Sequence, residues 1–95
     1  MRREYLVCYD ISDARRLRAV FRIVRGYGDA LQYSVFRCLL SGTEKVRLLA
    51  ELDEVIHARD DQVLLVDLGT ETRARAVFET LGRVLAHPER DVIVI

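Results

Sequence analysis

The fold is predicted most directly by residues 5–13, Tyr-Leu-Val-Cys-Tyr-Asp-Ile-Ser-Asp. Residues 5–9 are β-prone and apolar at both alternating sets of positions, which is typical of a strand covered on both faces. Asp10 stands at the end of this strand, and either Ser12 or Asp13 can cap the free N–H groups of a following helix. The segment therefore predicts a strand that turns directly into a helix, with a carboxylate at the turn.

The helix after this turn is expected over about residues 14–26, and Gly26 and Gly28 end it. Its core side carries apolar residues at helical spacing, namely Leu17, Val20, Phe21 and Val24. Its opposite side carries arginines that fall within a sector of ~80° at 100° per residue, namely Arg15, Arg18, Arg22 and Arg25.

The middle of the chain predicts a hairpin, a second helix and another strand. The hairpin has strands at about 29–32 and 35–41 and turns near Tyr33 and Ser34. Thr43 is expected to cap a helix over about 44–58, which would turn inward Leu48, Leu49, Leu52, Val55 and Ile56. Asp60 and Asp61 are expected to form a solvated turn before a strand at 62–68 that ends at Gly69 and Thr70.

The resulting order is strand, helix, strand, strand, helix, strand, which predicts an α+β, ferredoxin-like fold in a single domain of residues 1–95. Two helices then cover one face of an antiparallel sheet. Because the strands at 5–9 and 62–68 are apolar on both faces, the open face needs a cover, and a symmetric homodimer through the sheets provides one.

The end of the chain is open to two interpretations. Residues 74–81 fit a helix capped by Gly82, and 76–81 fit a short strand equally well. Residues 91–95 form an apolar, β-branched run that we expect to pair with an exposed sheet edge, on the partner subunit. Residues 74–95 are accordingly expected to be a tail exchanged in the dimer.

Arginine is unevenly distributed along a chain whose net charge is zero. Residues 1–37 carry eight arginines against four acids, whereas 38–95 carry seven basic residues against eleven acids. The planar guanidinium matches a phosphate with two hydrogen bonds, so the first part of the chain is a candidate for binding nucleic acid. Tyr5, Tyr9, Tyr27 and Tyr33 are candidates for stacking on bases, although Tyr5 and Tyr9 are expected to pack in the subunit contact.

The composition excludes several classes of protein. At 51% apolar and 32% charged residues, the chain is neither disordered nor of low complexity. No apolar run approaches the ~20 residues of a membrane span, so we expect a cytoplasmic protein with no membrane partner. Cys8 and Cys38 lie in apolar runs without a CxxC motif, which indicates neither a disulfide framework nor a zinc site.

Asp10 is the candidate for catalysis. A carboxylate at this turn, next to arginines, can hold Mg²⁺, and such pairs of metal and arginine serve phosphodiester cleavage. One Asp per chain is a weak metal site, whereas two copies related by a two-fold axis make a credible one. The alternative is that Asp10 and Asp13 only cap the helix.

Four segments together resemble the CRISPR-associated protein 2 family: 9–13 (Tyr-Asp-Ile-Ser-Asp), 16–18 (Arg-Leu-Arg), 26–28 (Gly-Tyr-Gly) and 32–36 (Gln-Tyr-Ser-Val-Phe). The likeness extends over nearly the whole chain, through Asp-Gln-Val at 61–63 and Phe-Glu-Thr-Leu-Gly at 78–82.

The resemblance implies a ferredoxin-like homodimer with an exchanged last strand. It implies a Mg²⁺-dependent endonuclease, acting on RNA or duplex DNA, in which Asp10 of each subunit holds the metal at the dimer axis. Ser12, Arg16, Arg18, Ser34 and Phe36 would line or support the same cleft. A second implied role is architectural: the dimer joins the integrase subunit during spacer acquisition and helps to hold the DNA.

Two positions depart from the family pattern. Many members have an arginine where this chain has Ala30, and a glutamate where it has Arg37. Losing the first would weaken phosphate binding, and Arg37 is expected to restore positive charge from a nearby strand. The sequence thus supports an enzyme or an architectural nucleic-acid-binding subunit; a small-molecule regulatory domain would leave the arginines unexplained.

Overall fold

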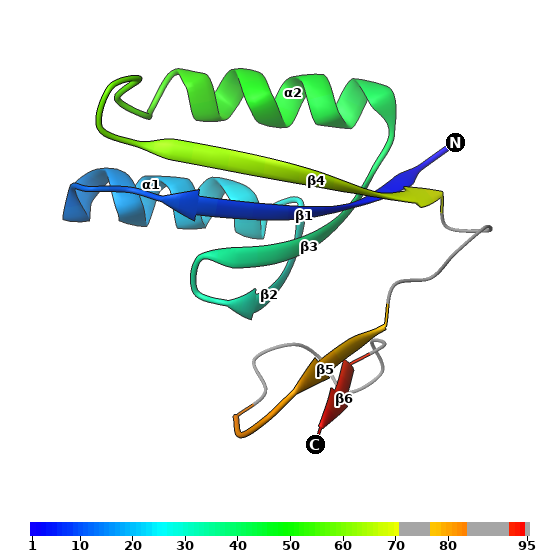
Figure 1. Ribbon diagram of the computed structural model, residues 1–95. Coiled ribbons are helices and arrows are strands. Elements are labelled where there is room, and N and C mark those ends of the chain that lie inside the picture. Colours follow the sequence, from blue (N-terminus) through cyan, green and yellow to red (C-terminus); the bar gives the residue numbers. More distant parts are fainter. Residues whose placement is uncertain (71–76, 84–91, 95) are drawn as a thin grey trace.

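The computed structural model describes residues 1–70, 77–83 and 92–94, and its main sheet has the strand order β2-β3-β1-β4. The elements follow the expected order: β1 (Arg3–Asp10), α1 (Ala14–Arg25), β2 (Gly28–Gln32), β3 (Val35–Leu40), α2 (Gly42–Asp53) and β4 (Gln62–Thr70). All three pairings within this sheet are antiparallel, with β1 between β3 and β4 (Figure 1). The α+β, ferredoxin-like plan is therefore confirmed.

Helix α1 begins where the sequence allows two caps, and Asp13 is the one used. Its side chain accepts a hydrogen bond from the Arg16 N–H at 2.9 Å. Val20 and Val24 are fully buried, as expected. Leu17, expected in the core, is 40% exposed and lies with Phe21 beside the β2–β3 turn.

The hairpin of β2 and β3 turns at Tyr33 and Ser34, as predicted. Its register shifts between Ala30 and Gln32, so β2 is irregular next to the turn. At the other end, a Cβ on Gly28 would collide with the backbone of Arg37. Only glycine fits this close approach of the two strands.

Helix α2 begins and ends earlier than expected. Ser41 caps it in a reciprocal capping box with Glu44, and Thr43 lies inside the first turn. The helix ends at Asp53, and just beyond it the Val55 N–H donates to the carbonyl of Leu52, three residues earlier, instead of the residue four earlier that an α-helix would use.

The apolar residues of this segment are divided between core and surface. Leu48 and Leu52 are buried, and Val55 and Ile56 pack against the core from outside the helix. Leu49, expected inward, is exposed. Val55 and Ile56 therefore reach the core from the turn that follows α2.

Strand β4 continues two residues beyond its expected end. Tyr5 pairs with Asp67 and Glu4 with Gly69, so Leu68 is an extra residue in the ladder. Gly69 accommodates this bulge with φ of 101°, a conformation that L side chains rarely adopt.

The two faces of the main sheet differ in cover. Buried side chains of the sheet, among them Tyr5, Val7 and Phe36, form one core cluster with residues of both helices. Leu6 and Cys8 alternate with these on β1 and lie opposite Val66 and Leu64, which are exposed. Around these four residues the second face is therefore apolar and, in the single chain, partly open to solvent.

The tail contains β5 (Phe78–Thr80) and β6 (Val92–Val94), which pair in parallel as a separate two-stranded sheet (Figure 1). The strand alternative is thus confirmed at 78–80, and the helix alternative is wrong there; residues 71–76 lie outside the described residues. Gly82 follows β5 in a turn with φ of 90° and caps no helix. The C-terminal strand is confirmed, and its exchange onto a partner stays a prediction.

Within the described residues, neither the length nor the apolar character of any helix would allow it to cross a lipid bilayer.

Candidate functional site

Asp10 occupies the expected place at the end of β1. It pairs with Gln62, the first residue of β4, and its side chain is exposed. Among the described residues, no group of three His, Cys, Asp or Glu side chains could hold a metal ion. A single chain thus offers one free-standing carboxylate here, which fits a metal site only if it is shared between two subunits.

Asp61 organises the turn that carries Asp10. Its carboxylate accepts from the Ser12 N–H at 3.0 Å, the Ser12 hydroxyl at 3.1 Å and the His57 N–H at 2.8 Å. Arg16 donates to both carboxylate oxygens, through Nε at 2.7 Å and Nη2 at 3.2 Å. The expectation of a solvated turn is wrong for Asp61, whose side chain is fully buried.

The same ion pair sets the charge state of this cluster. The hydrogen bonds from Arg16 hold the pKa of the Asp61 carboxyl well below its ordinary value, and N–H donors from His57 and Ser12 act in the same direction, although desolvation opposes them. In return, the hydrogen bond to Asp61 raises the pKa of Arg16. Both groups are charged near neutral pH, and they join the β1–α1 turn to the α2–β4 turn.

Sequence reasoning missed this role, although a signal for it was present. Antiparallel pairing places the start of β4 beside the end of β1, so a carboxylate just before residue 62 must lie near Asp10. Ser12 and Arg16, which the resemblance placed at the cleft, are the residues that Asp61 holds.

Ser34 lies at the same end of the sheet, in the β2–β3 turn. Its carbonyl accepts from the Tyr9 N–H at 3.0 Å, and the Tyr9 hydroxyl donates to the Tyr33 carbonyl. Burial raises the pKa of Tyr9 to about 12, so the hydroxyl remains a donor at neutral pH. These bonds attach the turn to the residue next to Asp10.

Phe36 supports this region from the core. It is fully buried and its ring centroid lies 6.2 Å from that of Tyr9 and 5.5 Å from that of Phe21. It therefore lines no cleft, and it holds the β1 end and α1 together by packing.

The arginines of α1 divide into two groups. Arg16 is committed to Asp61, as described above. The remaining four are exposed and make no ion pair within the described part of the chain: Arg15, Arg18, Arg22 and Arg25. We call these four the arginine row; they are the cationic surface nearest to Asp10 along the chain.

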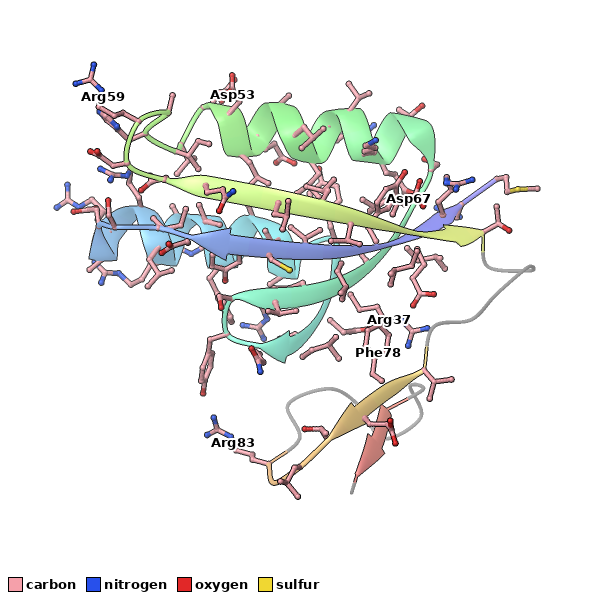
Figure 2. All side chains as sticks on the ribbon, viewed as in Figure 1. Arg37, Asp53, Arg59, Asp67, Phe78 and Arg83 are labelled. Atoms are coloured by element: carbon pink, nitrogen blue, oxygen red, sulfur yellow. The ribbon has the colours of Figure 1, made fainter. Side chains whose placement is uncertain are left out.

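Arg37 lies apart from the arginine row. It projects from β3 on the open face of the sheet, where it forms an ion pair with buried Glu4. Its guanidinium carbon also lies 5.3 Å from the ring centroid of Phe78 in β5 (Figure 2). Ala30 packs on the core side, so Arg37 does not replace an arginine at position 30. Its role in nucleic-acid binding stays a prediction.

Comparisons with known proteins agree with this geometry. The family model described as CRISPR associated protein Cas2 matches residues 3–82. A relative from Rhodospirillum rubrum, named CRISPR-associated endoribonuclease Cas2 1, is 37% identical over 91 residues, covering 96% of this chain and 89% of its own length. A relative from Thermodesulfovibrio yellowstonii, named CRISPR-associated endoribonuclease Cas2 2, is 48% identical over 68 residues, covering 72% of this chain and 75% of its own length.

The fold comparison leads to the same family. The crystal structure of Streptococcus pyogenes Cas2 at pH 6.5 superposes with a TM-score of 0.67 and 28% identity, covering 78% of this chain and 98% of that chain. The family match extends from β1 through Gly82 and so includes the Asp10 turn, the arginine row and the Asp61 cluster. This chain belongs to the CRISPR associated protein Cas2 family.

Proposed function

We propose that this chain is a metal-dependent endonuclease that cleaves RNA, with Asp10 as its catalytic residue. One observation carries the proposal: an exposed carboxylate stands at a turn that a buried ion pair fixes, next to an arginine row that forms no ion pair with the residues the structure describes. The names of the R. rubrum and T. yellowstonii relatives support RNA as the substrate. Duplex DNA is the second substrate that the same backbone contacts would accept.

Mg²⁺ is the cofactor that this donor set would take. It binds through one or two carboxylates and keeps several waters, which suits Asp10 from each of two subunits. Bound there, it would supply an activated water and charge neutralisation at the scissile phosphate.

The chain's own residues would bind and orient the substrate. The arginine row would hold the phosphates on either side of the cleavage point. Asp61 and Arg16 would keep the turn, and so the Asp10 carboxylate, in one position. The Ser34 backbone would keep the β2–β3 turn beside it.

The test is a nuclease assay on RNA and duplex DNA, with and without a chelator. We expect the chelator to abolish cleavage by the wild type. We expect Asp10→Asn to abolish the same cleavage without a chelator. Asp60→Asn is the matched control, because Asp60 is an exposed carboxylate at the same end of the molecule and lies 3.3 Å from His57, three residues earlier in the chain. Equal cleavage by Asp10→Asn and the wild type would refute the assignment.

A homodimer is part of this proposal, since one chain supplies one carboxylate. The open sheet face supports it: Leu64 is 49% exposed, and Val66 is exposed beside it. We propose that a second copy covers this face and that the β5–β6 tail is exchanged onto the partner's sheet.

The second candidate function is architectural. In it the dimer binds duplex DNA through the arginine row and joins the integrase subunit in spacer acquisition, with Asp10 idle. Within residues 1–70, 77–83 and 92–94 no cluster of metal ligands includes Asp10, which favours this candidate. If Asp10→Asn keeps duplex affinity and the dimer while the wild type cleaves nothing, this function replaces the first.

A further inference from the structure

An apolar groove lies between α1 and the β2–β3 turn, next to the arginine row. It has a volume of about 250 Å³ and is lined by Leu17, Arg18, Phe21, Tyr33 and Ser34. Two of these side chains present apolar surface to solvent: Leu17 is 40% exposed and Tyr33 is 62% exposed. Neither belongs to the core cluster, and together with Phe21 they form a contiguous apolar surface that is a candidate ligand site.

Tyr33 separates this groove from a second hollow. The second hollow is lined on its other side by the tail, through Thr80, Leu81 and Arg83. The Arg83 guanidinium carbon lies 5.7 Å from the Tyr33 ring centroid, and Figure 2 shows Arg83 at the end of β5. The ring of Phe21 approaches from the helix, with centroids 6.3 Å apart and a tilt of 47°. Tyr33 is thus an aromatic side chain between two arginines, Arg18 and Arg83.

The chemistry of the groove selects one kind of occupant. Its walls are aliphatic and aromatic, which suits a planar, weakly polar group, and its cationic rim suits an anion attached to that group. An unpaired nucleobase on its phosphate backbone has both features. A base in a duplex does not, because both of its faces are already stacked.

We propose that this groove binds one unpaired nucleobase, which stacks on Tyr33 while Arg18 contacts the adjoining phosphate. The inference rests on the proposed function, because it assigns a base-binding site to the nucleic acid that the arginine row holds. It adds a preference: single-stranded substrate binds more tightly than duplex of the same charge. Stacking carries no strict sequence requirement, so any base is accepted.

The test compares oligomers that differ only in their bases. Fluorescence anisotropy measures affinity for a single-stranded oligomer of about ten nucleotides and for an abasic sugar-phosphate oligomer of the same length and charge. We expect the wild type to prefer the base-bearing oligomer by roughly 5- to 100-fold. Tyr33→Leu should remove this preference and leave the abasic and duplex affinities unchanged, whereas Tyr33→Phe should retain it.

The variants keep the contact on which the fold depends, because the Tyr9 hydroxyl bonds to the Tyr33 carbonyl and not to its side chain. Val46→Ala is the matched control, since Val46 is 68% exposed on the other helix. Val46→Ala should show the same preference for the base-bearing oligomer as the wild type.

Three results would overturn the inference. Equal wild-type affinity for both oligomers would refute base stacking and leave backbone binding by the arginine row intact. No affinity for either would refute the nucleic-acid function together with it. Dissociation of a dimer by Tyr33→Leu, measured by sedimentation, would assign the groove to a second copy of the chain instead.

Discussion

Asp61 accepts hydrogen bonds from three residues that belong to three different segments: Ser12 in the β1–α1 turn, Arg16 in α1 and His57 after α2. A buried carboxylate with this many partners costs little to keep charged, whereas its neutral replacement leaves Arg16 without its counterion. The local structure around Asp10 therefore depends on a residue that never needs to touch the substrate.

We expect Asp61→Asn to lower the melting temperature by several degrees, because an amide cannot accept from Arg16 and the two N–H groups with both of its terminal atoms. Asp60→Asn, one residue earlier and exposed, should change it little. Thermal unfolding followed by circular dichroism measures both. The role of Asp61 would be contradicted if the two variants melted alike.

The same carboxylate makes stability depend on pH in the acid range. Its pKa in the folded protein lies below the ordinary value of 3.8, so its contribution is fully present above that value and is lost as the pH falls through the folded pKa. The difference in melting temperature between wild type and Asp61→Asn should therefore be constant above about pH 5 and shrink below about pH 4. A difference that grows on acidification would contradict this account.

Single residues show which parts of the site the sequence can reveal. Asp10 was predictable because its place, between a β-prone run and a helix cap, is local in sequence. Asp61 was not, because two adjacent aspartates usually mark a solvated turn, and only the contact with Ser12 and Arg16 across 45 or more residues distinguishes them. Arg37 shows the reverse case, since its charge suggested phosphate binding whereas the fold pairs it with Glu4.

Helix α1 places four of the arginines of this chain together on one exposed surface. Its apolar residues Val20 and Val24 face the core, so the helical period places the arginine row outward. Charged groups in such a row act on a phosphate backbone without regard to sequence.

We expect Arg18→Glu with Arg22→Glu to weaken binding to every sequence tested and to flatten the salt dependence of affinity. Each lost phosphate contact reduces the slope of log K against log salt by roughly one. Arg47→Glu on α2 is the control, because Arg47 is an exposed arginine on the other helix. Affinity measured from low to high salt distinguishes the double variant from the control. An unchanged slope in the double variant would mean that residues outside the arginine row contact the phosphate backbone.

Elements were predictable where the hydrophobic period is continuous, whereas the ends of α2 and β4 were not. Helix α2 was expected from Leu48 and Leu52, but its start depends on the Ser41–Glu44 capping box and its end on bonds to the Leu52 carbonyl. The β4 bulge at Leu68 likewise depends on its pairing with β1. Such details arise from hydrogen bonds between specific atoms, which periodicity does not describe.

At the scale of the whole molecule, the proposed metal site depends on the open sheet face, because this face is where a second subunit would bind. Leu6, Cys8, Leu64 and Val66 form an apolar surface on the side without helices. A second copy on this surface would remove it from water and supply the second Asp10 that a metal site needs.

We expect Leu64→Lys to weaken the dimer by at least about 100-fold, since a symmetric interface carries the change twice and each buried leucine contributes about 1.5–3 kcal/mol. Val46→Lys, an equally large change on exposed α2, is the control. Sedimentation equilibrium measures the dissociation constant. If Leu64→Lys associates as the wild type does, the open face is not the contact between subunits.

The tail gives a separate test of how the subunits are joined. Strand β6 adds three backbone pairings to β5, and an exchanged tail would bring both strands to the partner. Deleting residues 91–95 should then weaken association and lower the melting temperature together, because the same strand stabilises both. If the truncated chain dimerises unchanged and only its melting temperature falls, the tail is held within its own subunit, and the sheet face alone brings the two Asp10 carboxylates together.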